Sequence, residues 1–139
     1  MIHKATNEIS GEFERLGLQC QVRELEDLSC VEAHYVSEAV PDMTVRFISG
    51  DDENDVSMRV HNFVCGAPEN AAALTALCNA QNGKYRFVKF VCDSEGSVHL
   101  AYDLPLSAVS PAKICIEVFA RLCNIADETF PLFVETVGG

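Results

Sequence analysis

Hydrophobic positions in the first sixteen residues recur at the spacing of a helix. They fall on one helix face: Ile2, Ala5, Ile9, Phe13 and Leu16. Gly17 follows the last of them and suits the left-handed backbone at which many helices end. The pattern therefore predicts a helix over residues 2–16.

The chain then changes to an alternation of apolar and polar residues, which is typical of strands with one buried and one wet face. Four such segments follow one another, at residues 18–23, 30–35, 43–48 and 56–61. The turns between them are rich in acids or contain Pro41, which cannot donate to a sheet ladder. The pattern predicts four consecutive strands.

A second helix is predicted from Pro68 to Gly83, because proline is favoured at the first helical position. A hairpin then pairs residues 84–92 with residues 97–104 around a turn that ends in Gly96. Gly96 is expected to supply the positive φ that such a turn needs.

The last predicted helix carries apolar residues on one face and polar residues on the other. Ser110 is the expected N-cap, with Pro111 in the first helical position. The buried stripe consists of Ile114, Val118, Leu122, Ile125 and Phe130, and the wet side of Glu117, Arg121, Asn124 and Glu128. Pro131 lacks a backbone N–H, so we expect it to kink or end this helix.

These elements follow the order α-β-β-β-β-α-β-β-α. Strands alternate with long helices only twice, so the order predicts an α+β fold with a single antiparallel sheet packed by helices. A chain of 139 residues has the length of one domain, and we expect a single domain over residues 1–139.

The chain is strongly acidic, with 10 Lys+Arg against 21 Asp+Glu and a net charge of -11. Nucleic acids and anionic membranes both need a basic surface, so neither is an expected partner. No apolar run approaches the roughly 20 residues that span a bilayer. Residues 1–8 lack the apolar core of a signal peptide, which is consistent with a cytoplasmic protein.

Seven cysteines raise the question of disulfides, a metal site or redox chemistry. Their spacing contains no C-x-x-C or zinc-knuckle pattern: Cys20, Cys30, Cys65, Cys78, Cys92, Cys115 and Cys123. Most have apolar neighbours, so we expect buried, reduced thiols, as in a cytosolic protein. A redox sensor would instead need an exposed cysteine with a lowered pKa.

Local catalytic and cofactor motifs are missing from the sequence. There is no G-x-S-x-G, H-E-x-x-H, P-loop or G-x-G-x-x-G. The acidic run at 51–55 lacks the closing glutamate of a calcium loop, and the four histidines are scattered. We therefore expect no enzyme activity, no metal and no cofactor. The alternatives are a nonlocal His/Cys metal site and an unrecognised hydrolase.

Two asparagines, Asn79 and Asn82, lie three residues apart near the end of the predicted second helix. Their amides can bond the free carbonyls there or fix the neighbouring turn, and a ligand contact is the alternative. The surrounding stretch 77–90, LCNAQNGKYRFVKF, resembles the hallmark of the YbjN family. In that family two such asparagines end a helix, and a strand of the type Tyr-Arg-aromatic-Val-Lys-Phe follows.

The resemblance covers residues 43–137, through the hairpin to the closing pattern NIADETFP at 124–131. One departure is Phe87, where many relatives carry Trp. The resemblance implies an antiparallel sheet packed by helices, as in type III secretion chaperones, often in dimers. Family members are described as sensory-transduction regulators without known catalytic residues. Residues that match the family pattern are expected to be structural: Asn79, Asn82, Tyr85, Arg86, Lys89, Asp103, Asp127 and Pro131.

The missing motifs, the acidic balance and the resemblance together favour a non-enzymatic protein-binding module. We expect a chaperone-like or regulatory adaptor that forms a homodimer. The alternative is a sensor for a small molecule or peptide, with a pocket between sheet and helices. A cavity of roughly several hundred cubic ångströms with converging polar groups would favour the sensor.

Alternation also predicts a candidate interaction face, on the side of the sheet that the helices leave open. The residues expected on the side that the helices cover are Val22, Val31, Val45, Phe47, Val60, Val98 and Leu100. Polar neighbours of these residues on the strands then point away from the helices. These are Arg23, His34, Arg46, Arg59, His61 and His99. Ile48 and Phe63 are expected among them, and the acids mostly in turns and helices.

This arrangement would make the face locally cationic and able to receive an acidic partner segment or a second subunit. Its three histidines would strengthen the contact as pH falls through about 6.5, the ordinary histidine pKa. The alternative is an ordinary solvated face, on which arginine is a tolerated strand residue with a long apolar stem.

Overall fold

A computed structural model describes residues 1–50, 55–105 and 111–138 of the chain. The helices are α1 (Lys4–Arg15), α2 (Ala71–Lys84), which follows the short 3-10 helix η1 (Pro68–Asn70), and α3 (Pro111–Gly138). The strands are β1 (Gln21–Glu24), β2 (Leu28–Tyr35), β3 (Met43–Gly50), β4 (Asp55–Cys65), β5 (Lys89–Cys92) and β6 (Ser97–Pro105). The predicted α+β class and the predicted order of helices and strands are confirmed.

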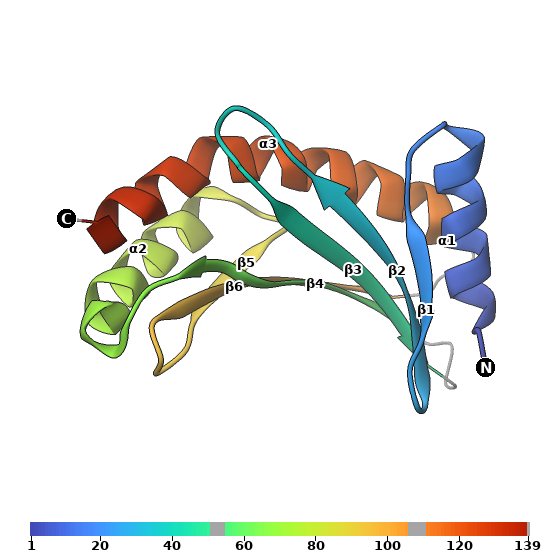
Figure 1. Cartoon of the computed structure of the whole chain (residues 1–139), viewed down its shortest axis with the longest axis horizontal. Helices are drawn as coiled ribbons and strands as arrows, with labels where there is room; N and C mark the ends of the chain where they lie inside the picture. The colour runs from blue at the N-terminus through green and yellow to red at the C-terminus, as the bar shows by residue number, and fades with distance from the viewer. Residues whose placement is uncertain (51–54, 106–110, 139) are drawn as a thin grey trace.

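The strands form one antiparallel sheet in the order β1-β2-β3-β4-β6-β5. β6 lies between β4 and β5, so β1 and β5 are the two edges of the sheet (Figure 1). Val31 lies opposite Phe47, and Phe47 lies opposite Met58, so the buried positions of neighbouring strands line up.

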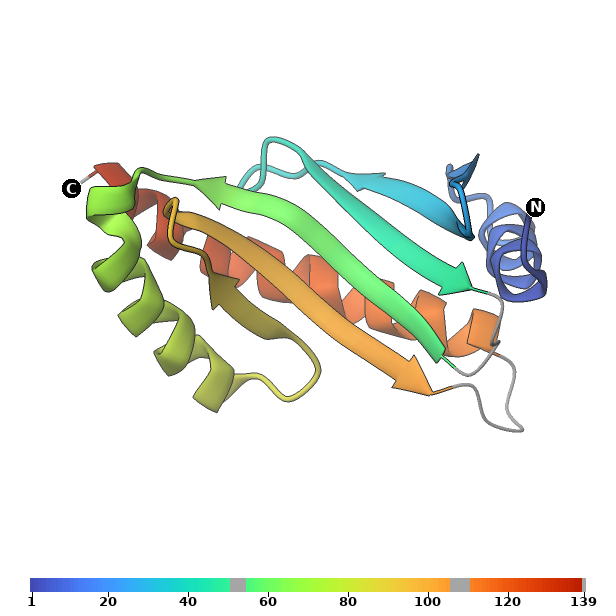
Figure 2. The same ribbon diagram turned by 90° about the horizontal axis from the view of Figure 1, so that it is seen from below.

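α3 crosses one face of this sheet, and Figure 2 shows the other face in front of it. α1 lies at the β1 end and α2 beside β5 at the opposite end (Figures 1 and 2). Four fully buried phenylalanines join the layers: Phe13, Phe47, Phe90 and Phe133. Phe13 packs edge-on against Phe119 of α3 at 5.4 Å between ring centroids, and Phe90 stacks on Phe133 at 5.5 Å.

Two glycines adopt the positive φ angles that the sequence predicts. Gly17 has φ 72, and the N–H groups of Gly17 and Leu18 donate back to Glu14 and Phe13, which ends α1. Gly96 has φ 80 in the β5–β6 turn. A Cβ atom at Gly96 would lie 2.0 Å from the carbonyl oxygen of Ala67, so no larger residue fits there.

A bulge in β4 overturns the predicted position of Phe63. The pairing of β4 with β6 shifts register between Val60 and Val64, and Asn62 within the bulge has φ 55. β4 advances four residues from Val60 to Val64 while β6 advances two, so the bulge adds two residues, and Val60 and Val64 are both buried on the helix side. The left-handed backbone at Asn62 interrupts the alternation between them. Phe63 is therefore buried under α3, at 5.4 Å from the Phe130 ring, and is absent from the open side.

Pro131 does not end the last helix, because α3 continues to Gly138. Phe130 before the proline and Phe133 after it both contact Phe63, at 5.4 and 6.1 Å between ring centroids. This packing on both sides of the proline stabilises the helix across the missing N–H. The predicted N-cap, Ser110, lies outside the described residues.

Candidate interaction face

The face of the sheet opposite α3 carries a row of residues that crosses all six strands. Gln21, Glu32, Arg46, Arg59, Ala101 and Lys89 lie opposite one another in the order of the strands. Residues two positions away share this side. We call this side the open face, and its charged and histidine members are Arg23, Glu32, His34, Arg46, Arg59, His61, Lys89, His99 and Asp103.

Glu32 joins Arg23 and Arg46 into one cluster at the centre of the β1–β2–β3 part of the open face. Arg23 Nε donates to Glu32 Oε1, and Arg46 Nε donates to Glu32 Oε2 at 2.6 Å. The Glu32 side chain is only 4% exposed, whereas those of Arg23 and Arg46 are 60% and 40% exposed. The buried carboxylate therefore holds two exposed guanidinium groups in place.

The electrostatics of this cluster keep Glu32 ionised. Burial raises the pKa of the Glu32 carboxyl, but the hydrogen bonds from Arg46 and Arg23 outweigh burial and hold the pKa below its ordinary value. The Nε–H of each arginine donates to Glu32, and each guanidinium group has four further N–H donors on its terminal nitrogens. Within the described residues no acceptor is found for the terminal N–H groups of Arg23 and Arg46, so these groups can bind a partner.

Arg59 pairs with a different carboxylate on the open face. Its Nη1 donates to Asp103 Oδ1 at 2.7 Å and to the Met58 carbonyl at 2.8 Å. The hydrogen bond from Arg59 is the main cause of the lowered pKa of Asp103. Asp103, which matches the family pattern, therefore also holds Arg59 in place on the open face.

His99 has a fixed orientation beside the β4 bulge. The backbone N–H of Asn62 donates to His99 Nδ1 at 3.0 Å, so the neutral ring carries its proton on Nε2. Nε2 then donates to Asp93 Oδ2 at 2.8 Å. This bond is the first cause of the lowered pKa of Asp93, and backbone N–H groups of the turn add to it.

His61 lies edge-on to His99, with ring centroids 5.8 Å apart. Burial, followed by the charges of His99, Arg46 and Arg59, lowers the pKa of His61 below its ordinary value. His61 therefore takes up its proton at a lower pH than the ordinary value of about 6.5 that the sequence suggested. The third histidine of the open face, His34, is exposed on β2, with its Nδ1 3.0 Å from Thr44 Oγ1.

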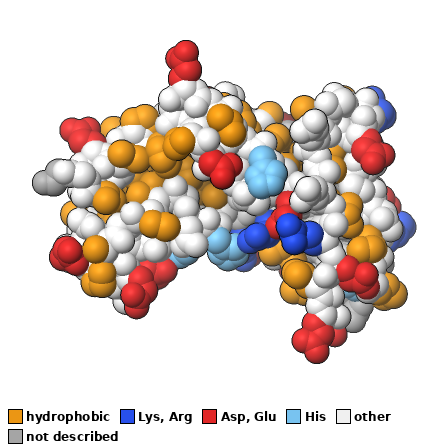
Figure 3. All heavy atoms as spheres, in the orientation of Figure 1, with side chains coloured by type: hydrophobic (Ala, Val, Ile, Leu, Met, Phe, Trp, Pro, Cys, Tyr) orange, Lys and Arg blue, Asp and Glu red, His pale blue; other side chains and the backbone are white. Residues whose placement is uncertain are grey.

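The open face therefore carries paired acids among the expected arginines and histidines. Glu32 and Asp103 lie among the arginines, and Asp93 contacts His99. Figure 3 shows basic, histidine and acidic side chains against one another near the middle of the molecule. Lys89, which sequence reasoning did not place on this side, lies at its β5 end. Ile48 is part of this face, as predicted, opposite Cys30 and Ser57.

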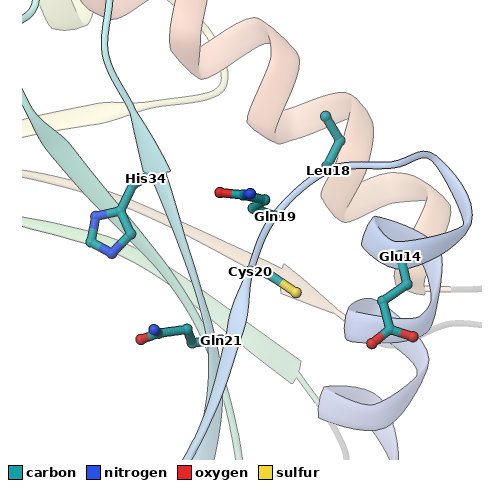
Figure 4. Close-up of a pocket in the computed structure, with 6 residues that line it drawn as sticks. All are labelled: Glu14, Leu18, Gln19, Cys20, Gln21 and His34. Atoms are coloured by element: carbon teal, nitrogen blue, oxygen red, sulfur yellow. The ribbon is translucent and has the colours of Figure 1, made fainter.

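A cavity of about 410 Å³ lies beside His34, where the chain enters β1. Its lining consists of Glu14, Leu18, Gln19, Cys20, Gln21 and His34. In Figure 4 the Gln19 and Gln21 side chains extend towards the His34 side, whereas Cys20 points towards α1. Burial, and then the charge of Glu14, raises the pKa of Cys20, so this thiol lacks the lowered pKa of a reactive cysteine.

The two family asparagines have different surroundings. Asn82 Nδ2 donates to the Phe90 carbonyl at 3.0 Å, and the Phe90 N–H donates to Asn82 Oδ1 at 2.7 Å. The Asn82 amide thus pairs with the outer edge of β5 as a neighbouring strand would. Asn79 is exposed on α2.

Other residues of the family pattern connect distant parts of the chain. Asp127 on α3 accepts hydrogen bonds from Ser37 Oγ and Tyr35 Oη at 2.5 and 2.7 Å, and these bonds lower its pKa. Tyr85 Oη donates to Glu128, and burial and this bond raise the Tyr85 pKa to about 12.

Arg86 precedes β5 and lies outside the open face. It lines a second cavity of about 360 Å³, between the α2–β5 connection and α3. The other lining residues are Lys84, Tyr85, Phe87, Arg121, Asn124 and Ile125. The Arg121 guanidinium lies 4.5 Å from the Phe87 ring centroid, so cations and aromatic rings meet at this cavity.

The seven thiols are all free. Four cysteines are buried (Cys30, Cys78, Cys115 and Cys123), and Cys65 is exposed. In residues 1–50, 55–105 and 111–138 no three His, Cys, Asp or Glu side chains come together as metal ligands would. No helix in these ranges has the length and apolar character needed to cross a membrane.

Comparison with known protein families gives one match over nearly the whole chain. Residues 6–133 match the model of the YbjN family, which is described as "Putative bacterial sensory transduction regulator". The chain belongs to the YbjN family. The search of curated proteins found no match. The hydrogen bonds of Asn82 to Phe90 and the Asp127 contacts are thus features of a YbjN chain. The family is described as a regulator.

Proposed function

We propose that this YbjN chain is a cytoplasmic, non-enzymatic regulatory module that binds a protein partner through its open face. The observation that carries the proposal is the buried Glu32 between Arg23 and Arg46. Arginine is enriched at protein interfaces, and side chains held in place before binding lose less conformational entropy when a partner docks. The cluster thus presents two oriented guanidinium groups whose terminal N–H groups can donate to a partner.

The chemistry of these donors indicates the kind of partner segment. Guanidinium groups bind carboxylates with two parallel hydrogen bonds, and they also donate to backbone carbonyls. The cluster of two arginines and one glutamate carries one net positive charge on a chain of net charge -11. A segment with a few carboxylates fits this local charge, and a long acidic stretch would be repelled by the rest of the molecule.

A sensor role is the second candidate, and the cavity beside Arg86 favours it. Its volume of about 360 Å³ is within the usual range of small-molecule sites. Three cationic side chains and two aromatic rings line it, which suits an organic anion. Binding there would be insensitive to changes at Arg23 and Arg46, which separates the two candidates.

The test is an NMR titration of the labelled protein with a short glutamate-containing peptide. We expect chemical-shift changes confined to the open face around Arg23, Arg46 and Arg59, which weaken as salt is raised. The variant Arg23→Gln/Glu32→Gln/Arg46→Gln should abolish them. It removes the cluster without leaving a buried, unpaired carboxylate, which would destabilise the fold.

The matched control is Lys113→Gln, an exposed residue on α3, because it changes the net charge of the protein by the same amount. It should leave the titration unchanged. Shifts around Arg86 and Phe87 would favour the sensor, and shifts that survive the triple glutamine change would refute the role of the Glu32 cluster.

A further inference from the structure

A chain of hydrogen bonds runs from the β4 bulge through His99 to the β5–β6 turn. The Asn62 N–H donates to His99 Nδ1 at 3.0 Å, and His99 Nε2 donates to Asp93 Oδ2 at 2.8 Å. The other oxygen of Asp93 accepts the backbone N–H groups of Glu95 at 2.9 Å and Ser97 at 3.0 Å. One imidazole ring therefore connects the bulge of β4 to the turn before β6.

This chain of bonds requires a neutral His99. Nδ1 accepts a hydrogen bond through its lone pair, whereas both nitrogens of a protonated imidazole are donors. Protonation would turn two N–H groups against each other at the Asn62 contact, and this bond would be lost. The bond to Asp93 would become charge-assisted and stronger. Acid therefore acts in opposite directions at the two ends: it releases the bulge and holds the turn.

The backbone of the bulge depends on such support. Asn62 has φ 55, in the left-handed region that residues other than glycine seldom adopt and that persists where the surroundings hold it. The next residue, Phe63, packs under α3 at 5.4 Å from the Phe130 ring and 6.1 Å from the Phe133 ring. The conformation of Asn62 therefore sets the position of Phe63 against α3.

The packing on the helix side leaves Phe63 room to move. Phe63, Val64 and Cys65 line an apolar cavity of about 320 Å³ against the C-terminal part of α3. A side chain beside such a cavity can shift without displacing a tightly packed neighbour. A change at the bulge can therefore alter the contact between Phe63 and α3.

Several charged groups lie around His61 and His99 and act in opposite directions. Asp93 accepts the hydrogen bond from His99 and favours a positive charge on that ring. Nearby cationic groups oppose such a charge, and they are Arg59 on β4, Arg46 on β3 and Lys89 on β5. Asp103 partly offsets Arg59. His61 adds a second titrating ring, 5.8 Å from His99 between ring centroids.

We propose that His99 makes the β4 bulge pH-sensitive: protonation of His99 releases the Asn62 N–H, the bulge leaves its left-handed conformation, and Phe63 loosens from α3. The two-state element is the bulge, and the proton on His99 selects its state. A change of pH on the open face thus reaches the helix on the opposite side of the sheet. The proposal does not rest on the partner-binding role of the open face.

The first test is an NMR titration of the labelled full chain from about pH 8 to about pH 5, the range in which histidines titrate. We expect the hydrogen-exchange protection factor of the Asn62 amide to fall at least about tenfold, with the midpoint of the His99 ring. The amides of Glu95 and Ser97 should keep their protection. Contacts of the Phe63 ring with Phe130 should weaken over the same range.

Two matched variants assign the effect to His99. His99→Asn offers an amide oxygen close to the position of Nδ1, which accepts the Asn62 N–H and does not titrate. It should keep the bulge and remove its pH dependence. His61→Asn makes the same change on the neighbouring ring and should leave the Asn62 transition in place. Circular dichroism should show that both variants are folded.

The wild-type titration decides the proposal even if a variant does not fold. An Asn62 amide that is unchanged while His99 titrates would overturn it, and so would a His99 ring that stays neutral down to about pH 5. It would also be overturned if His99→Asn kept the pH dependence, or if His61→Asn abolished it. These measurements use the protein without a peptide, so they are independent of the peptide titration of the open face.

Discussion

Glu32 illustrates at the scale of one residue how burial and charge combine on the open face. Its carboxylate is nearly inaccessible to water, which alone would favour the neutral form. Arg23 and Arg46 reverse this preference, so the ionised form is the one that the folded chain stabilises. The same contacts hold the two arginines in place. Protonation of the Glu32 carboxylate would therefore weaken both the stability and the proposed binding of this face.

The stability contributed by Glu32 should depend on pH. Its pKa is lower in the folded chain than in the unfolded chain, so the contribution is present at neutral pH and lost as pH falls through the lowered pKa. The difference in unfolding free energy between wild type and Glu32→Gln should therefore shrink between about pH 7 and about pH 3. Denaturant unfolding at several pH values measures it.

The control for this pH dependence is Glu117→Gln on α3. Glu117 forms an exposed ion pair with Arg121, and such surface pairs contribute little to stability. Its difference from wild type should change less with pH. An equal change in both variants would mean that the Glu32 cluster does not stabilise the ionised carboxylate.

Thiol reactivity should separate Cys65 from the buried cysteines. Cys65 is exposed, whereas burial raises the pKa of Cys115 and Cys123 to about 12, and raises that of Cys78 to about 11. A thiol reagent should modify Cys65 first in the native protein and seven cysteines after unfolding without reductant. A count of five or fewer in the unfolded chain would indicate a disulfide.

At the scale of the elements, short-range patterns predicted the helices and strands, and longer-range contacts set the exceptions. Alternation correctly placed Val31, Val45 and Phe47 in the core. It placed Phe63 on the wrong side, because no local signal shows the two extra residues of the β4 bulge or the left-handed backbone at Asn62. The helical pattern also did not predict that α3 runs past Pro131, where Phe130 and Phe133 both pack on Phe63.

Asn82 should matter more than its neighbour in the family pattern. Asn82→Ala leaves the partly buried N–H and carbonyl of Phe90 without their partner, and we expect a loss of about 1–3 kcal/mol in unfolding free energy. Asn79→Ala, at an exposed position on the same helix, should cost less than about 0.5 kcal/mol. Faster hydrogen exchange of the Phe90 amide in the first variant alone would locate the effect, and equal costs would argue against it.

The two sides of α3 should also differ in their sensitivity to truncation. Leu122 is fully buried, so Leu122→Ala should cost roughly 2–5 kcal/mol through the cavity it leaves. Glu117→Ala on the exposed side should cost under about 0.5 kcal/mol. Denaturant melts compare the two, and similar losses would contradict the assigned faces of this helix.

At the scale of the whole molecule, the sequence predicts which strand residues point away from the helices, but their pairing across strands comes only from the structure. Arg23, Glu32 and Arg46 lie on three strands, so their meeting depends on register. The alternation that selected Arg46 also places Glu32 on the same side, and this signal identifies the acid among the arginines. The histidine surroundings depend in turn on the bulge at Asn62.

Cross-linking in cells that produce the protein tests most directly the claim that the open face binds a protein. A photoreactive amino acid at Ala101, between Arg59 and Lys89 on this face, should capture a partner protein. The same amino acid at Ala120, exposed on α3, should not capture it. The account predicts that Arg23→Gln/Glu32→Gln/Arg46→Gln removes the Ala101 adduct. An adduct that persists in that variant, or one formed equally from Ala120, would contradict it.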